Sequence, residues 1–308
     1  MDVKSAFLNG ILEEELYVEQ PDGYIEKVQE NCHKLHKSLY GLKQEPHTWY
    51  TRIDTYFINN DFEKCPCEHT LYMKTDSQNN MIILCLYVDD LIFLSNNNEM
   101  VKEFMEAMIR EFEMTDLGLM SYFLGLEVLQ PEDGIFVSQQ RYAKEILKRF
   151  KMNDCKPILT PVESRLKLTK EGTGELVNPT DFKCLLGSLR YLISTRPDIV
   201  FGVRLFSRFM ESPKQSHLQA AKSILRYICG TIDYGIFYNS TETMNLVEYT
   251  DNDWVGDIEE RKSTSGFAFD IGSGYFSWSS KKQQVVALCS FMCCTCSLVK
   301  KNAEISLS

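Results

Sequence analysis

The sequence lacks any apolar run long enough to cross a membrane. Its longest uninterrupted apolar stretch is residues 81–88, and these eight residues fall far short of the roughly 20 that a bilayer requires. The first residues, Met1-Asp2-Val3-Lys4, contain no apolar signal core. We therefore expect a protein that is neither secreted nor membrane-spanning.

Cysteines at a regular pairing interval are also lacking, although the chain has 11 of them. Without a secretory signal we expect free thiols. A zinc site needs paired Cys/His clusters, and Cys65 and Cys67 with His69 form only a weak candidate. The 308 residues are 44% apolar and 25% charged, which indicates a globular chain of up to two domains.

Positive charge is scarce overall, since the net charge is -10, and this average argues against a nucleic-acid partner. The distribution is uneven, however. Residues 141–230 hold 17 Lys and Arg against 8 Asp and Glu, a net charge of +9, so the rest of the chain carries -19. Two interpretations stay open: a surface that binds phosphate, or a pair of solvated basic helix faces.

The clearest local signal is acidic. The apolar residues 81–88 predict a buried strand, Asp89-Asp90 follow, and residues 91–94 resume the strand, which together predict a hairpin with two carboxylates at its tip. Adjacent carboxylates raise each other's cost of ionising, and a divalent cation removes that conflict. The alternative is an ordinary acidic turn.

Asp2 is the expected partner of this tip. It lies in a segment, residues 2–7, that alternates like the end of a strand. An aspartate there, facing Asp89 from a neighbouring strand, would form a cradle for two metal ions. Against this, Asp2 is next to a chain terminus, and termini fray.

The remaining pattern alternates between helices and strands. We expect helices from residue 45 and over 99–114, 139–151 and 213–230, and a hairpin over 122–138. Short strands are expected over 247–249, 266–270 and 275–278. The polar, turn-rich segment 160–179 is the expected linker or domain edge.

Several motifs occur in an order that resembles the reverse transcriptase of copia-type LTR retrotransposons, over about residues 1–288. They are Met1-Asp2-Val3-Lys4-Ser5-Ala6-Phe7-Leu8-Asn9-Gly10, Leu39-Tyr40-Gly41-Leu42-Lys43-Gln44, Tyr87-Val88-Asp89-Asp90-Leu91, Tyr122-Phe123-Leu124-Gly125, Gly187-Ser188-Leu189-Arg190-Tyr191-Leu192, Thr195-Arg196-Pro197-Asp198-Ile199, Tyr249-Thr250-Asp251-Asn252-Asp253-Trp254, Arg261-Lys262-Ser263-Thr264-Ser265-Gly266 and Ser277-Trp278-Ser279-Ser280-Lys281-Lys282-Gln283.

The resemblance implies an α+β fold: a palm of antiparallel sheet backed by helices, a helical thumb and connection, and a truncated ribonuclease H-like β segment. The corresponding ranges are 1–160 for the palm, with the fingers missing, 161–240 for the thumb and connection, 245–288 for the ribonuclease H start and 289–308 for an aberrant Cys-rich tail. The implied partners are an RNA or DNA template-primer, deoxynucleotides and other Pol segments. The implied location is the cytoplasm, in a virus-like particle, or the nucleus.

The resemblance also implies a catalytic set. Asp2, Asp89 and Asp90 correspond to the polymerase carboxylates, which bind two Mg²⁺ ions, or Mn²⁺, with Asp2 and Asp89 as the principal ligands. The ancestral reaction adds deoxynucleotides to a primer 3'-end. Asp251 corresponds to the first metal-binding carboxylate of ribonuclease H.

Three further residues are implied in substrate binding. Phe7 falls where the family places an aromatic ring under the incoming sugar, which blocks a 2'-hydroxyl; in isolation it would be taken for a core aromatic. Gln44 matches the position that contacts the nascent base pair or template, and Lys43 precedes it.

Departures from the family pattern lead us to expect an inactive polymerase. The chain begins at the first catalytic motif, so the fingers and their cations are missing. Glu45-Pro46-His47 stands where the family has a small residue and then Pro-Arg, which adds an anion and removes a cation. Met292 occupies the place of a ribonuclease glutamate, and a frameshift would explain the Cys-rich tail. The alternatives are a non-catalytic nucleic-acid-binding remnant that uses residues 141–230, and an unstable relic.

Overall fold

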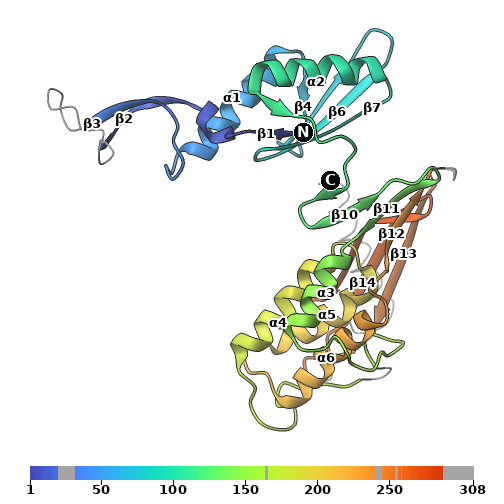
Figure 1. Ribbon diagram of the computed structural model, residues 1–308. Coiled ribbons are helices and arrows are strands. Elements are labelled where there is room, and N and C mark those ends of the chain that lie inside the picture. Colours follow the sequence, from blue (N-terminus) through green and yellow to red (C-terminus); the bar gives the residue numbers. More distant parts are fainter. Residues whose placement is uncertain (20–31, 164–165, 241–244, 254–255, 258, 287–308) are drawn as a thin grey trace. The chain divides into compact units, whose positions relative to one another are not determined.

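The computed structural model describes residues 1–308 apart from 20–31, 164–165, 241–244, 254–255, 258 and 287–308. The chain divides into two compact units, Met1–Met120 and Ser121–Ser308 (Figure 1). In the described part of the chain, no helix has the length and apolar character that crossing a membrane requires.

The first unit contains a six-stranded sheet in which every neighbouring pair is antiparallel. In spatial order its strands are β4 (Glu63–Lys64), β5 (Leu71–Thr75), β6 (Met81–Tyr87), β7 (Asp90–Ser95), β1 (Asp2–Val3) and β8 (Met114–Thr115). Along β6, buried residues alternate with half-buried ones, which is the pattern of a strand covered more fully on one face. The expected strand–turn–strand over 81–94 is confirmed.

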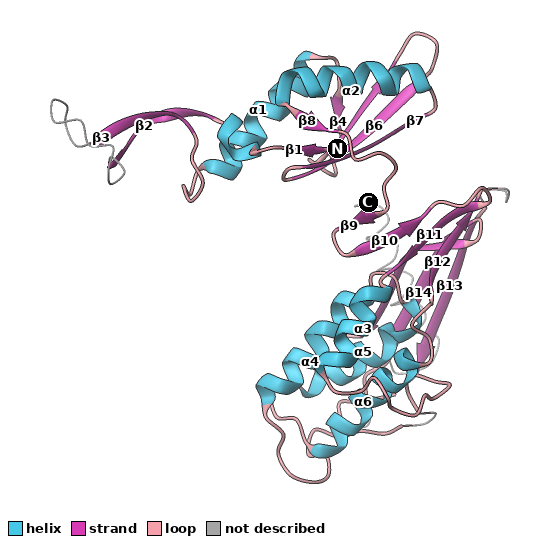
Figure 2. Cartoon of the chain, viewed as in Figure 1, coloured by secondary structure: helices cyan, strands magenta, loops and turns pink. Residues whose placement is uncertain are grey.

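Two helices cover one face of this sheet (Figure 2). Helix α1 (Glu45–Asn59) begins with a proline in its first turn and buries Trp49, Ile53 and Phe57, which recur every four residues. Helix α2 (Asn98–Phe112) confirms the expected 99–114 helix but ends earlier, because Glu113 adopts a left-handed conformation with φ 53°. The two helices and the sheet share one apolar core.

The expected strand character of residues 2–7 is wrong beyond Val3. Ser5 has a left-handed φ of 56°, and Ala6–Asn9 form the 3-10 helix η1. Strand β2 (Ile11–Glu19) follows and pairs with β3 (Cys32–Lys37), so that this hairpin extends away from the sheet (Figure 1).

The second unit has a helical core. Its helices are α3 (Gln140–Arg149), α4 (Pro179–Leu192), α5 (Val200–Phe206) and α6 (Gln215–Cys229), with the 3-10 turns η2 (Pro197–Ile199) and η3 (Ser207–Phe209). Their buried Leu, Ile, Val and Phe side chains form one cluster. The expected helices over 139–151 and 213–230 are confirmed.

Two antiparallel sheets complete this unit. One has the order β12-β11-β10-β9, with strands β9 (Tyr122–Phe123), β10 (Leu126–Leu129), β11 (Gly134–Ser138) and β12 (Gly235–Asn239). The other has the order β13-β14-β15, with strands β13 (Leu246–Asp253), β14 (Thr264–Ile271) and β15 (Gly274–Lys282). The first expected strand, 122–130, is interrupted because Leu124 and Gly125 have positive φ angles of 47° and 81°.

In the segment 160–179, the described residues before Pro179, which are all but 164–165, form no helix or regular strand, as expected, but they belong to the second unit rather than to the division between the units. Leu166 and Leu168 of this segment pack against the helical cluster, and the division follows Met120. The α+β class is confirmed. The palm, thumb and ribonuclease H ranges stay predictions, and Met292 and the tail 289–308 lie outside the described residues.

Candidate active site

The predicted acidic tip is a two-residue turn. Tyr87 pairs with Asp90 across the β6–β7 hairpin, which leaves Val88 and Asp89 as the turn. Asp90 is therefore the first residue of β7 and not part of the tip itself. Val88 has a φ of 56°, which is unfavourable for a β-branched residue and stores roughly 1–3 kcal/mol of strain.

Strand β1 brings Asp2 directly opposite Asp90. The Val3 N–H donates to the Asp89 carbonyl at 3.0 Å, and the Leu91 N–H donates to the Met1 carbonyl at 2.9 Å. These bonds flank the Asp2–Asp90 pair, so it is the non-hydrogen-bonded type, in which the Cα atoms are about 4.5 Å apart. Both side chains therefore point to the same face of the sheet at close range.

This corner of the first unit has a negative electrostatic potential. Burial raises the pKa of the Asp90 carboxyl, and the charges of Asp89 and Asp2 raise it further. The chain-terminal ammonium of Met1 opposes these effects; burial lowers its own pKa, while Asp116, Asp90 and Asp2 raise it. Sequence reasoning missed Asp116, which follows β8 and becomes a neighbour only through sheet pairing.

The residues present fit a magnesium ion that shares its coordination with a ligand. Within the described ranges, no group of three or more His, Cys, Asp or Glu side chains is arranged to hold a metal by itself. Magnesium usually takes one or two carboxylates and completes its shell with substrate phosphates and water. Asp2 and Asp90 supply such a pair, and Asp89 lies exposed in the adjacent turn.

Phe7 lies in η1 and packs edge-on against Tyr40, with ring centroids 5.6 Å apart. Its ring is half-buried, and the Tyr40 side chain is exposed. The two rings form a partly accessible aromatic surface, and Phe7 also packs against the core of the first unit.

Gln44 lies at the N-terminus of α1 and lines a cavity of about 570 Å³ between this helix and the start of β2. Its Nε2 donates to Glu14 at 3.2 Å, and His47 and Arg52 line the same cavity. Lys43, the residue before it, is exposed.

The Glu45 carboxylate, one of the departures noted in the sequence, accepts a hydrogen bond from the Gly41 N–H at 2.7 Å. It is therefore tied to the turn that precedes α1. This contact fixes its negative charge at the same helix end that carries Gln44.

Trp49 was not identified as a functional candidate from the sequence. It is 2% exposed, and its indole Nε1 donates to the Val88 carbonyl at 2.6 Å. The only sequence signal was its place in the apolar series with Ile53 and Phe57. The contact with the turn arises from packing of α1 on the sheet.

Asp251 lies in the second unit, on β13, opposite Gly266 of β14. Its side chain is exposed. Its predicted role depends on further carboxylates, and in the described part of this unit no set of three metal-binding side chains surrounds it.

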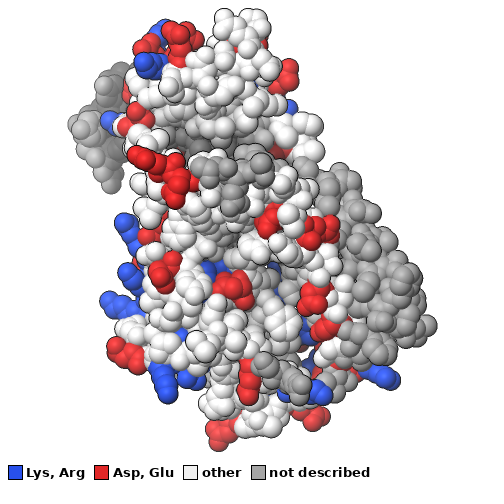
Figure 3. Space-filling model, turned by 90° about the vertical axis from the view of Figure 1, so that its right-hand side faces the viewer, with Lys and Arg blue, Asp and Glu red and all other residues white. Residues whose placement is uncertain are grey.

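Several cations of the basic segment 141–230 lie on exposed positions of helices α3 and α4. Figure 3 shows Lys and Arg side chains on the surface of the molecule, interspersed with Asp and Glu. Lys144, Lys148 and Arg190 are exposed, and among the described residues none of them has an acidic partner within ion-pair distance. Arg141 has one, Glu127, at 3.8 Å.

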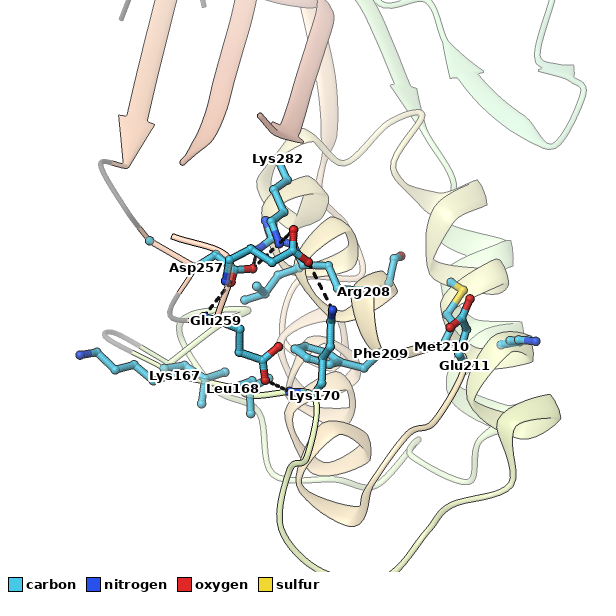
Figure 4. A pocket seen from close by; sticks show the side chains of 16 residues that line it. Lys167, Leu168, Lys170, Arg208, Phe209, Met210, Glu211, Asp257, Glu259 and Lys282 are labelled. Atoms are coloured by element: carbon cyan, nitrogen blue, oxygen red, sulfur yellow. Dashed lines mark hydrogen bonds and ion pairs between the residues drawn. The ribbon is translucent and has the colours of Figure 1, made fainter. Parts of the chain in front are cut away.

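A cavity of the second unit, about 660 Å³, is lined by charges of both signs (Figure 4). Asp257 forms ion pairs with Lys282 at 2.5 Å and Arg208 at 3.4 Å. Glu260 forms ion pairs with Lys170 at 3.3 Å and with Lys282 at 3.2 Å. These ion pairs join β15 to the helical core.

Comparisons with known proteins agree with this architecture. The profile of the family described as reverse transcriptase (RNA-dependent DNA polymerase) matches residues 1–164. The chain is 36% identical over 288 residues to the retrovirus-related Pol polyprotein from transposon RE2 of Arabidopsis thaliana. The aligned region is 93% of this chain and 20% of that protein. The chain is 38% identical over 301 residues to the retrovirus-related Pol polyprotein from transposon TNT 1-94 of Nicotiana tabacum, covering 94% and 22%.

A shorter relative is similar along nearly its whole length. A transposon Ty5-1 protein of Saccharomyces cerevisiae is 31% identical over 285 residues, which is 92% of each chain. The chain spans about a fifth of the length of the plant Pol polyproteins. It belongs to the reverse transcriptase (RNA-dependent DNA polymerase) family, among the Pol polyproteins of copia-type transposons.

Proposed function

We propose that the corner formed by Asp2, Asp89 and Asp90 is the catalytic site of an RNA-directed DNA polymerase. The observation that carries this proposal is the close Asp2–Asp90 pair beside a strained turn that bears Asp89, in a chain of this family. Two divalent cations bound there would activate the primer 3'-hydroxyl and stabilise the pyrophosphate leaving group.

The chain's own residues would bind and orient the substrates. Asp2 and Asp90 hold two negative charges at close range. A divalent cation bound between them would relieve their repulsion. Phe7 would pack against the sugar and exclude a 2'-hydroxyl. Gln44 would orient the nascent base pair, and Lys43 would attract phosphate. RNA or DNA template-primer and deoxynucleotides are the corresponding partners.

We further propose that this chain is defective in that reaction. The carboxylate of Glu45 is held at the helix end that carries Gln44, where it repels phosphate. His47 lacks the permanently charged guanidinium that an arginine would supply at this position. Both differences weaken the electrostatic stabilisation on which phosphoryl transfer depends.

Primer extension on an RNA template tests this proposal. We expect wild-type protein to extend no more than Asp89→Asn protein, and a Glu45→Ala, His47→Arg double variant to bind deoxynucleotide more tightly than wild type. Wild-type extension that Asp89→Asn abolishes would contradict the defect but support the site.

Metal binding tests the site independently of turnover. We expect Mn²⁺, measured by electron paramagnetic resonance of the free ion, to bind wild-type protein and to bind Asp2→Asn and Asp90→Asn protein much more weakly. Glu103→Gln on the exposed face of α2 is the matched control and should bind as wild type does. Equal binding in all four proteins would refute the assignment.

We also propose ribonuclease H ancestry for the three-stranded antiparallel sheet that carries Asp251. We expect no RNA cleavage from it, since Asp251 is the single carboxylate assigned there. Magnesium-dependent cleavage of an RNA–DNA hybrid that Asp251→Asn abolishes would contradict this expectation.

Non-catalytic nucleic-acid binding is the second candidate function, and the exposed cations without acidic partners on α3 and α4 favour it. Such binding should weaken steeply as salt increases, because phosphate contacts release counterions. It should survive Asp89→Asn. Binding that does not depend on salt, or that requires Asp89, would exclude it.

A further inference from the structure

The Val88–Asp89 turn has one backbone carbonyl at its centre, that of Val88. The peptide unit between these residues can in principle flip, which changes ψ of Val88 and φ of Asp89 together and converts one two-residue turn type into another. In the structure, Val88 has a φ of 56° and Asp89 does not have a positive φ. The orientation of this peptide therefore determines the direction in which the Asp89 side chain projects from the backbone.

The indole of Trp49 holds that carbonyl. Its Nε1 donates to the Val88 oxygen at 2.6 Å, and the side chain is 2% exposed, so water has little access from the helix side. The neighbouring Asp89 carbonyl is bound by the Val3 N–H at 3.0 Å. Both carbonyls of the turn are thus occupied, one by strand pairing and one by a side chain from α1.

The Trp49 ring has little freedom to follow a moving turn. It packs edge-on against Phe112 of α2, with centroids 5.6 Å apart and planes at 90°. The backbone of α1 also lies close to Gly10, since a Cβ added to Gly10 would lie 3.0 Å from the Trp49 backbone nitrogen. The Trp49 Nε1 donor is therefore held in position by contacts outside the turn.

We propose that Trp49 is a positioning residue that selects the peptide orientation of the Val88–Asp89 turn and so aims Asp89 beside the Asp2–Asp90 pair. The part that concerns the turn stands by itself. The consequence for metal binding rests on the proposed polymerase site.

The test separates the N–H from the bulk of the ring. Trp49→Phe retains an aromatic side chain without a donor, and 3-benzothienylalanine at position 49 retains the two-ring shape without the N–H. Trp278→Phe is a matched control, because the Trp278 Nε1 donates to a backbone carbonyl, that of Ile193, at 3.0 Å in the second unit. Thermal unfolding, amide hydrogen exchange and Mn²⁺ affinity are measured for each protein.

Loss of the N–H should loosen the turn without unfolding the unit. We expect amide exchange at Val3 and over residues 86–92 to accelerate about fivefold in both position-49 variants, with α2 unchanged, since a net hydrogen bond of about 1 kcal/mol corresponds to that factor. We expect weaker Mn²⁺ binding in both, and neither effect in Trp278→Phe.

Each outcome decides a separate statement. Unchanged exchange in the benzothienylalanine protein would overturn the positioning role and leave Trp49 as a core residue. If exchange is faster in the position-49 variants but wild-type protein binds no Mn²⁺, the positioning role is supported and the polymerase site is refuted. Faster exchange with undiminished Mn²⁺ affinity would refute the claim that the turn aims Asp89 at a metal.

Discussion

Replacing Asp90 by asparagine should stabilise the first unit in the absence of metal. The Asp2–Asp90 pair places two carboxylates on one face in the closer kind of antiparallel pairing. At a separation of about 5 Å and a dielectric constant near that of water, two unit charges repel by about 1 kcal/mol, and like charges directly opposite one another in a sheet are destabilising. Asparagine keeps the shape and removes this repulsion.

The expected gain is therefore about 1 kcal/mol in the free energy of unfolding, or about 2–4 °C in melting temperature. Thermal unfolding in EDTA, followed by tryptophan fluorescence, measures it. Glu103→Gln on the exposed face of α2 removes one negative charge from the same unit and should change the melting temperature by less than about 1 °C, because surface substitutions away from special contacts have small effects.

Divalent metal should reverse this order. A ligand present at 100 times its dissociation constant adds about 2.7 kcal/mol to the protein that binds it. Wild-type protein should gain that stability in saturating Mg²⁺, and Asp90→Asn protein should gain much less. A variant that is less stable than wild type in EDTA, or that gains as much from Mg²⁺, would refute the reasoning that the pair is strained by charge and relieved by a cation.

Three more predictions concern the second unit. Hydrogen bonds from Lys262, Lys282 and Lys170 lower the pKa of Glu260 to about 2, so the stability that it contributes is present above pH about 4.5 and is lost as the pH falls toward 2; melting temperatures of Glu260→Gln should lack this part of the acid dependence. Arg196→Met should lower the free energy of unfolding in urea by about 3 kcal/mol, because it leaves Asp198 and the Thr231 oxygens without their buried partner. A Lys144→Glu, Lys148→Glu variant should reduce the slope of log affinity against log salt, measured on duplex RNA–DNA, by about 2. An unaltered acid transition, an undiminished stability or an unchanged slope would contradict the respective statement.

Local signals in the sequence were sufficient for the elements nearest the site. The apolar run over 81–88 and the 3.6-residue period of α2 identify a hairpin and a helix, because each pattern depends only on neighbouring residues. The end of α2 was missed by two residues, since the left-handed Glu113 has no glycine or proline to mark it.

Other features depend on long-range packing and left little trace in the sequence. The pairing of Asp2 with Asp90 joins residues far apart in the chain. The sequence suggested that Asp2 lies beside the acidic turn, but it placed Asp2 opposite Asp89, whereas the strand register places Asp90 there. The hydrogen bond from Trp49 to Val88 depends on how α1 lies on the sheet. Residues 2–7 alternated as a strand does, but packing of Ala6 and Phe7 against α1 favours a 3-10 turn there.

Because a ribosome makes the chain from its N-terminal end, the sheet topology determines when the acidic corner can form. Strand β1 is made before the other strands of its sheet, yet it fits between β7 and β8, which are made more than 85 residues later. At elongation rates of roughly 5–20 residues per second, Asp2 would wait for several seconds before its partners emerge. During this time the nascent chain holds an aspartate with no counterpart, and the acidic corner is among the last parts of the first unit to be completed.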